Sequence, residues 1–259
     1  MTGAEPSVLF EKRDAVLQVS LNRTAVLNAV NIRVLKDMEI GLRANAGNPD
    51  IKVLMLSGRG RCFASGADIE ELADLDETGI RQFHQLRERT FALLENFPSP
   101  TVAVIQGYAL GTGLELALCC DFRIAAADAM LGVPSAKLGI AESYEYISRL
   151  VQAVGPFRAK KLLLTGERID AAAAFHIGLI EEVVPVDDLL NRAETLAADI
   201  ALNSTQSMVE SKKVVAALVK DPNMLSVQDK AATMVQSMHS ADFREGVAAF
   251  MEKRRARFR

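Results

Sequence analysis

Apolar segments with the pattern of short β-strands alternate with helical patterns over the first 185 residues, and strand patterns then stop. Residues 53–56 and 101–105 are apolar runs of strand length, each bounded by turn residues. A helical period of apolar residues over 78–96 separates them. Strands that alternate with helices predict an α/β fold, and their right-handed connections favour stacked turns of a spiral.

The expected elements can be placed by range. In the first part of the chain they are a strand at 8–12, a two-residue turn at Arg13-Asp14, a strand at 15–21, a helix at 31–46, a strand at 52–56, a helix at 78–96 and a strand at 101–105. Four helices follow, at 186–203, 205–220, 226–239 and 243–250. We therefore predict a core over residues 1–185 and a helical region over residues 186–259. Such a region usually packs on its own core or on a neighbouring subunit.

The scarcity of cysteine and histidine argues against several kinds of site. The cysteines are odd in number and two are adjacent, so they form neither a disulfide framework nor a CxxC zinc site. The histidines lie too far apart in the sequence for an HExxH-type metal site. The residues concerned are Cys62, Cys119, Cys120, His84, His176 and His239. We expect no metal, and no nucleophile activated by a histidine.

Charge and hydropathy narrow the class of protein further. A net charge of −3 argues against a nucleic-acid-binding protein, which usually carries a basic excess. The first residues show no basic segment followed by an apolar one, so no secretion signal is expected. No apolar run approaches the roughly 20 residues needed to span a bilayer. We expect a cytoplasmic protein that binds neither nucleic acid nor a membrane.

Two glycine-containing turns, at 63–69 and 107–115, each lead from a strand into a helix. Small residues let a ligand approach the main chain, and helix N-termini present unpaired N–H groups. Two such turns facing each other would place two N–H donors on one oxygen, an oxyanion hole suited to an enolate or a tetrahedral intermediate. The alternative is a pair of ordinary glycine turns, since neither matches the GxGxxG or P-loop pattern.

Glu115 is the lone carboxylate of an otherwise apolar helix that follows the second turn. Burial would raise its pKa, and the positive end of the helix dipole would oppose that rise. A buried glutamate beside oxyanion donors is a candidate general acid or base. The alternative is a structural glutamate paired with a buried arginine.

These turns belong to a longer set of segments that occur in the order found in one family. The segments are Leu21-Asn22-Arg23, Leu27-Asn28-Ala29, Phe63 to Ile69, Gly107 to Asp121, Leu163 to Gly166, Gly178 to Val184, and Phe250 to Arg254. On these residues the sequence resembles the crotonase, or enoyl-CoA hydratase/isomerase, superfamily over essentially its whole length. The resemblance implies an α/β fold built as a spiral of ββα turns, with the site in residues 1–185, and a helical C-terminal region that assembles trimers or hexamers.

The resemblance also implies a substrate and a set of site residues. The substrate would be an acyl-CoA thioester, and no separate cofactor is expected because coenzyme A is part of the substrate. The thioester oxygen would accept the N–H groups of Ala67 and Thr112, and Glu115 matches one of the two catalytic glutamates of the hydratases. Residues that match substrate-binding or CoA-binding positions of the family are Ser65, Asp68, Ile69 and Lys253.

Departures from the family pattern concern the acid/base groups. Ser135 stands where the hydratases have their second glutamate, and Ser143 where dienoyl-CoA isomerases have a third carboxylate. The usual glycine-rich stretch is replaced by 142–146, so the predicted acyl pocket has Ser135, Glu142, Ser143, Tyr144 and Glu145 as candidates. Two lysines that often contact CoA phosphates are replaced by Ala25 and Glu70.

These departures leave the reaction open. Addition of water to an enoyl thioester needs two carboxyls, so Ser135 disfavours hydration, whereas Glu115 alone can move a double bond. Glu142 or Glu145 could supply the missing carboxylate, but a charged loop residue is more often solvated. We predict an acyl-CoA enzyme with a single acid/base glutamate and keep hydratase and isomerase open. A non-catalytic acyl-CoA binder, a decarboxylase or a thioester hydrolase of the same superfamily are the alternatives.

Overall fold

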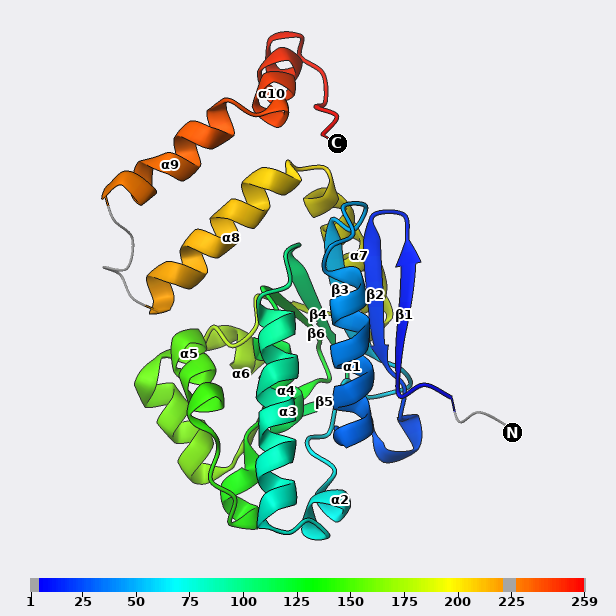
Figure 1. Cartoon of the computed structure of the whole chain (residues 1–259). Coiled ribbons are helices and arrows are strands. Elements are labelled where there is room, and N and C mark those ends of the chain that lie inside the picture. Colours follow the sequence, from blue (N-terminus) through cyan, green and yellow to red (C-terminus); the bar gives the residue numbers. More distant parts are fainter. Residues whose placement is uncertain (1–4, 221–226, 259) are drawn as a thin grey trace.

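A computed structural model describes residues 5–220 and 227–258 and shows an α/β body from which C-terminal helices extend (Figure 1). The larger sheet has the strand order β1-β2-β3-β4-β6-β9. Its strands are β1 (Val8–Arg13), β2 (Val16–Leu21), β3 (Val53–Gly58), β4 (Thr101–Ile105), β6 (Phe122–Ala126) and β9 (Glu182–Val184). Strands β1 and β2 form an antiparallel hairpin, and every other neighbouring pair is parallel.

A smaller sheet lies beside the larger one and carries part of the second glycine turn. It contains β5 (Tyr108–Leu110), β7 (Met130–Gly132) and β8 (Arg168–Asp170). Strand β7 pairs with β5 in parallel and with β8 in antiparallel orientation. Because β5 follows β4 directly, the chain leaves the larger sheet at the point where the second turn begins.

Helices connect and cover these strands. They are α1 (Ile32–Asn45), α2 (Ile69–Ala73), α3 (Glu77–Glu95), α4 (Thr112–Leu118), α5 (Tyr144–Thr165), α6 (Ala171–His176), α7 (Leu189–Ala201), α8 (Thr205–Lys220), α9 (Val227–Met238) and α10 (Ala241–Met251). Short 3-10 helices are η1 (Thr24–Val26), η2 (Pro134–Leu138) and η3 (Val186–Asp188). Within the described residues, no helix is long and apolar enough to cross a membrane.

The larger sheet buries both faces, as its apolar strands require. Leu54 and Leu56 of β3 belong to the main core, which also contains apolar side chains of α1, α3, α4 and α5. Val53 and Met55, which alternate with them, pack with side chains of α7 in a second cluster. Helices α1 and α3 lie side by side over the first face (Figure 1). The alternation along one strand therefore decides which helices cover which face.

Most elements expected from the sequence are present. The hairpin turns at Asp14, which adopts a positive φ of 50°, and the helix expected at 31–46 is α1, capped by the side chain of Asn31. Helix α8 has the expected bounds, and the described part of the helix expected at 226–239 is α9. Residue 226 lies outside the described residues. The spiral fold with a helical C-terminal region is confirmed.

One region differs from the expectation of a loop at 142–146. Ser143 caps a helix there, because its hydroxyl accepts the N–H of Tyr146, and α5 begins at Tyr144. The path of α5 is interrupted at Gly155, where φ is 76° and Pro156 follows. A serine is among the preferred residues at a helix N-cap, and the cap by Ser143 decides the local structure here.

Candidate active site

Main-chain hydrogen bonds join the two glycine turns. The N–H of Ala64 donates to the carbonyl oxygen of Tyr108 at 2.9 Å, and the N–H of Leu110 donates to the carbonyl oxygen of Ala64 at 3.1 Å. Helix α4 then approaches the first turn so closely that a Cβ at Gly113 would lie within 3 Å of both the oxygen and the Cβ of Ala64. Only glycine permits this approach, so the N-terminus of α4 faces the first turn.

Residues 23–30 hold the first turn from its other side. The side chain of Asn28 donates to the carbonyl oxygens of Arg59 at 3.0 Å and Cys62 at 2.6 Å. Arg23 forms an ion pair with Asp68 at 2.9 Å, and Asp68 also caps α2. Asn28 and Arg23 therefore hold the first turn in place through polar contacts.

Ala67 and Thr112 present N–H groups at this junction. Thr112 is the first residue of α4 and follows Gly111, whose φ of 49° and ψ of −122° favour glycine. Within residues 5–220 and 227–258, neither the N–H of Ala67 nor that of Thr112 donates a hydrogen bond. Both residues line a cavity of about 100 Å³, called here the turn cavity. Two residues with unpaired main-chain N–H groups therefore line one small cavity.

The turn cavity has both apolar and polar walls. It is lined by Ser65, Gly66, Ala67, Ile69, Leu72, Phe83, Arg87, Gly111, Thr112, Pro134, Ser135, Leu138, Ile140 and Glu142. Convergent polar groups in an otherwise apolar cavity are typical of a binding site for a small organic group.

Glu115 lies in the first turn of α4 and is fully buried. Its Oε1 accepts a hydrogen bond from Arg149 Nη1 at 3.0 Å, and its Oε2 lies 3.5 Å from Arg87 Nε without a hydrogen bond. Burial raises the pKa of Glu115 to about 8, and the charges of Arg87 and Arg149 oppose this rise. Burial therefore favours the protonated carboxyl, and the two adjoining arginines favour the carboxylate.

A second carboxyl group faces the turn cavity. The hydroxyl of Ser135, which is nearly buried, donates a hydrogen bond to Glu142 Oε1. The negative charge of Glu142 is one of the influences that raise the pKa of Glu115. The two glutamates therefore interact electrostatically across this site.

Comparison with known proteins decides the family. A model of the enoyl-CoA hydratase/isomerase family matches residues 11–259. The chain belongs to this family.

Relatives cover almost the whole chain. The crotonyl-CoA hydratase of Syntrophomonas wolfei is 35% identical over 261 residues, covering 98% of each chain. The short-chain-enoyl-CoA hydratase of Clostridium acetobutylicum is 32% identical over 250 residues, covering 96% of each. A solved structure of an enoyl-CoA hydratase/carnithine racemase from Magnetospirillum magneticum has a TM-score of 0.95 at 28% identity, over 99% of this chain and 96% of that one.

The structure brings only some of the family-derived positions together. The predicted residues that line the turn cavity are Ser65, Ala67, Ile69, Thr112, Ser135 and Glu142. Asp68 instead pairs with Arg23, and Lys253 is an exposed residue just after α10.

The remaining candidates occupy the start of α5. Ser143 caps this helix, and neither it nor the two residues after it line the turn cavity. Tyr144 is 82% exposed, so it forms no wall of this cavity, and Glu145 is half-buried on the same turn of helix. These residues lie outside the cavity wall because the cap by Ser143 makes them the first turn of α5.

Arg87 is a residue of the site that the sequence prediction missed. It lines the turn cavity from α3 and contacts Glu115, which itself does not line the cavity. Its neighbours on the buried face of α3 are apolar or neutral, including Phe83, Leu86 and Phe91. A charged residue on a buried helical stripe usually has a buried partner, and this pattern is the signal that could have found it.

Proposed function

We propose that the chain acts on acyl-CoA thioesters as an enzyme of the enoyl-CoA hydratase/isomerase type. In this proposal the thioester carbonyl oxygen accepts the N–H groups of Ala67 and Thr112, and Glu115 transfers a proton at the adjacent carbon. Coenzyme A enters as part of the substrate. The observation that carries the proposal is that two residues with unpaired main-chain N–H groups line one cavity, and that a buried glutamate with a raised pKa contacts Arg87 in the wall of that cavity.

Oxyanion stabilisation explains why the two donors matter. When the α-carbon gains or loses a proton, or a nucleophile adds at the β-carbon, negative charge accumulates on the thioester oxygen. A single preorganised donor contributes about 3 kcal/mol to such a transition state. The low dielectric of a largely apolar cavity strengthens the interaction.

For Glu115 to exchange a proton with the substrate, a side chain that contacts its carboxyl has to move. Because Arg87 lines the turn cavity and contacts Glu115, a bound acyl group has to displace the Arg87 side chain to reach the carboxyl. The cavity volume of about 100 Å³ is also well below the roughly 300–1,000 Å³ of ordinary ligand pockets. We therefore propose that only the acyl end of the thioester enters this cavity.

Water addition is the first candidate reaction. Relatives at 32–35% identity carry the names crotonyl-CoA hydratase and short-chain-enoyl-CoA hydratase, which supports hydration. Double-bond isomerisation is the second candidate, because Ser135 leaves the usual second position without a carboxylate and Glu115 alone can remove and return a proton.

Incubation with acyl-CoAs in heavy water tests the proposal. Mass spectrometry follows deuterium uptake at the α- and γ-carbons and the addition of water across a panel of saturated and unsaturated thioesters. Exchange that is lost in Glu115→Gln and retained in the control Glu77→Gln, an exposed residue of α3, supports an enzyme. Tight binding across the panel without exchange or water addition supports a non-catalytic binder instead.

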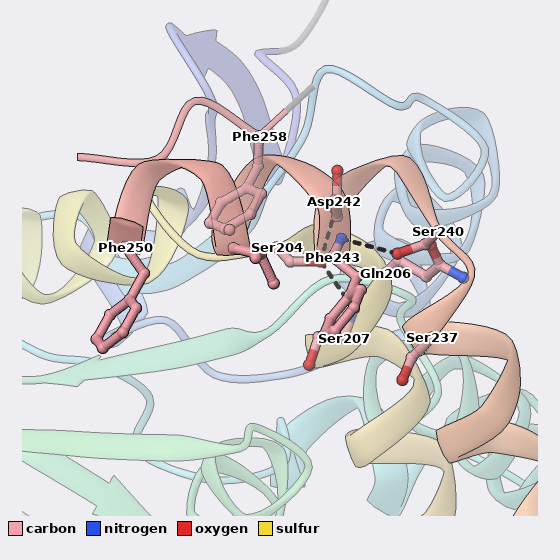
Figure 2. Close-up of a pocket in the computed structure, with 11 residues that line it drawn as sticks. Ser204, Gln206, Ser207, Ser237, Ser240, Asp242, Phe243, Phe250 and Phe258 are labelled. Carbon is pink, nitrogen blue, oxygen red and sulfur yellow. Dashed lines mark hydrogen bonds between the residues drawn. The ribbon is translucent and has the colours of Figure 1, made fainter. Parts of the chain in front are cut away.

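We further propose that α8, α9 and α10 form contacts between subunits. Apolar side chains remain exposed on these helices, among them Val215, Met234, Phe250 and Met251. Figure 2 shows Phe243, Phe250 and Phe258 beside a pocket of about 350 Å³, where Ser204 donates to Asp242 at 2.5 Å. Exposed apolar groups of this kind are typical of an interface. Sedimentation analysis that finds only monomers at micromolar concentration contradicts this proposal.

A further inference from the structure

The turn cavity contains a carboxylate at a position that the family pattern does not provide. Glu142 is half-buried, lines the same cavity as Ala67 and Thr112, and accepts a hydrogen bond from Ser135. Ser135 occupies the position where the hydratases have their second glutamate. The hydroxyl at this position therefore binds a carboxylate that comes from seven residues further along the chain.

Local structure fixes this arrangement. After η2 the chain reverses at Gly139, whose φ is 72°, and the N–H of Ile140 donates to the carbonyl oxygen of Ser135 at 3.0 Å. Ser143 then caps α5, so the segment that carries Glu142 is held at both ends. The carboxylate is thus positioned by short-range contacts that do not depend on a ligand.

The surroundings of Glu142 differ from those of a structural ion pair. In the part of the chain that the structure describes, no lysine, arginine or histidine lies within salt-bridge distance of Glu142, whereas Glu115 has two arginines. Buried carboxylates that serve stability alone are usually paired with a cation or several donors. Glu142 has one hydroxyl partner and faces the cavity, which leaves it able to accept a further hydrogen bond.

The two glutamates have the complementary environments of an acid/base pair. Glu115 is fully buried, which raises its pKa, while Glu142 is partly accessible and held by a neutral hydroxyl. Environments that separate two carboxyls into an acid and a base allow one site to donate and accept protons in the same reaction.

We propose that Glu142, held by Ser135, is the second catalytic carboxyl of this site and accepts a proton from the water molecule that adds to an enoyl thioester. This inference rests on the proposed function. An O–H bond of water breaks as its oxygen forms a bond to C3, and the electron pair of the C2–C3 double bond moves toward the thioester oxygen at Ala67 and Thr112. Glu115 then gives its proton to C2.

The reaction needs no oxidant and no reactant other than water and the enoyl thioester. One water molecule is added, its proton resides on Glu142, and Glu115 has become a carboxylate. Transfer of that proton to Glu115 through solvent restores the starting state. Ser135 acts as a positioning residue, because its hydroxyl orients the carboxylate and forms no bond to the substrate.

The variant Glu142→Gln distinguishes removal of a proton from water, the step given to Glu142, from proton transfer at the α-carbon, the step given to Glu115. Glutamine keeps an oxygen that accepts from Ser135 but cannot take a proton from water, so hydration of a short enoyl-CoA should fall about 100-fold or more. Exchange of α-protons in a saturated acyl-CoA, in which Glu115 and not Glu142 transfers the proton, should fall far less than hydration. The exchange readout also shows that the variant is folded. Glu77→Gln is the matched control.

A rescue variant tests position as well as charge. Adding Ser135→Glu to Glu142→Gln places a carboxylate at the usual family position and should restore hydration at least 10-fold over Glu142→Gln alone. Hydration within 3-fold of wild type in Glu142→Gln would overturn the inference, as would equal loss of hydration and exchange. A wild-type protein that exchanges α-protons but adds no water contradicts only the role of Glu142. Absence of both reactions contradicts the proposed function itself.

Discussion

The hydroxyl of Tyr146 donates a hydrogen bond to the carbonyl oxygen of Gly111 at 2.8 Å. This carbonyl belongs to the same peptide group as the N–H of Thr112, a residue that lines the turn cavity. A hydrogen bond to the oxygen of a peptide group polarises that group and strengthens its N–H as a donor. Tyr146, which is fully buried, therefore fixes the peptide plane that the proposed oxyanion hole uses.

Tyr146→Phe removes this hydrogen bond and keeps the ring in place. The oxygen of Gly111 loses one of its two hydrogen bonds and keeps the one from the N–H of Glu115 at 3.0 Å, so the free energy of unfolding should fall by about 1 kcal/mol. The turnover number should fall several-fold with little change in KM, because the donor acts on the transition state. Urea unfolding and steady-state kinetics measure these effects. Unchanged stability and turnover would contradict the role given to Tyr146.

Gly113→Ala tests the contact between the two glycine turns. The added Cβ would lie within 3 Å of Ala64 atoms, so the main chain has to shift, and we expect a loss of about 2–4 kcal/mol in unfolding free energy. At Gly47 a Cβ meets nothing within 4 Å, which makes Gly47→Ala the control, expected within about 0.5 kcal/mol of wild type. Equal stability of the two variants would mean that α4 does not approach Ala64 as described.

The raised pKa of Glu115 makes stability depend on pH. The folded chain keeps this proton up to about pH 8, whereas the unfolded chain releases it near the ordinary glutamate value of about 4.5. The stabilising contribution of the proton is complete below the unfolded pKa and is lost as pH rises toward 8, with a slope of at most about 1.4 kcal/mol per pH unit. Unfolding curves between pH 5 and 9 should show this slope in wild type but not in Glu115→Gln. Identical slopes would contradict it.

Arg87 should influence the acidity of Glu115. Its positive charge lowers the pKa of the buried carboxyl, so Arg87→Met should raise this pKa further and move the alkaline limit of hydration to higher pH. Arg81→Met, on the exposed face of the same helix, is the control. Profiles of kcat/KM against pH provide the measurement. An alkaline limit that stays in place, or moves to lower pH, would show that Arg87 does not control Glu115.

The extent to which the fold follows from the sequence depends on element length. Helices α1, α3 and α8 span several turns, so their apolar period predicts their bounds to within about two residues. Strands β5, β7, β8 and β9 have three residues each, too few for a period of two to be visible, and pairing with distant strands decides them.

In the candidate site, too, local sequence patterns could be predicted and contacts between distant elements could not. The glycine turns and Glu115 are local patterns, and the structure places the two turns together as predicted. The contacts of Glu115 with Arg87 and of Tyr146 with Gly111 join different elements. Their partners depend on how α3, α4 and α5 pack, and no local pattern contains that information.

The catalytic role of Glu115 is tested by deuterium uptake and water addition on a short enoyl-CoA in heavy water, compared between wild type and Glu115→Gln. Wild type should add water and incorporate deuterium at the α-carbon, and both reactions should fall by about 100-fold or more in the variant. A Glu115→Gln protein that retains both reactions at the wild-type rate would contradict this role.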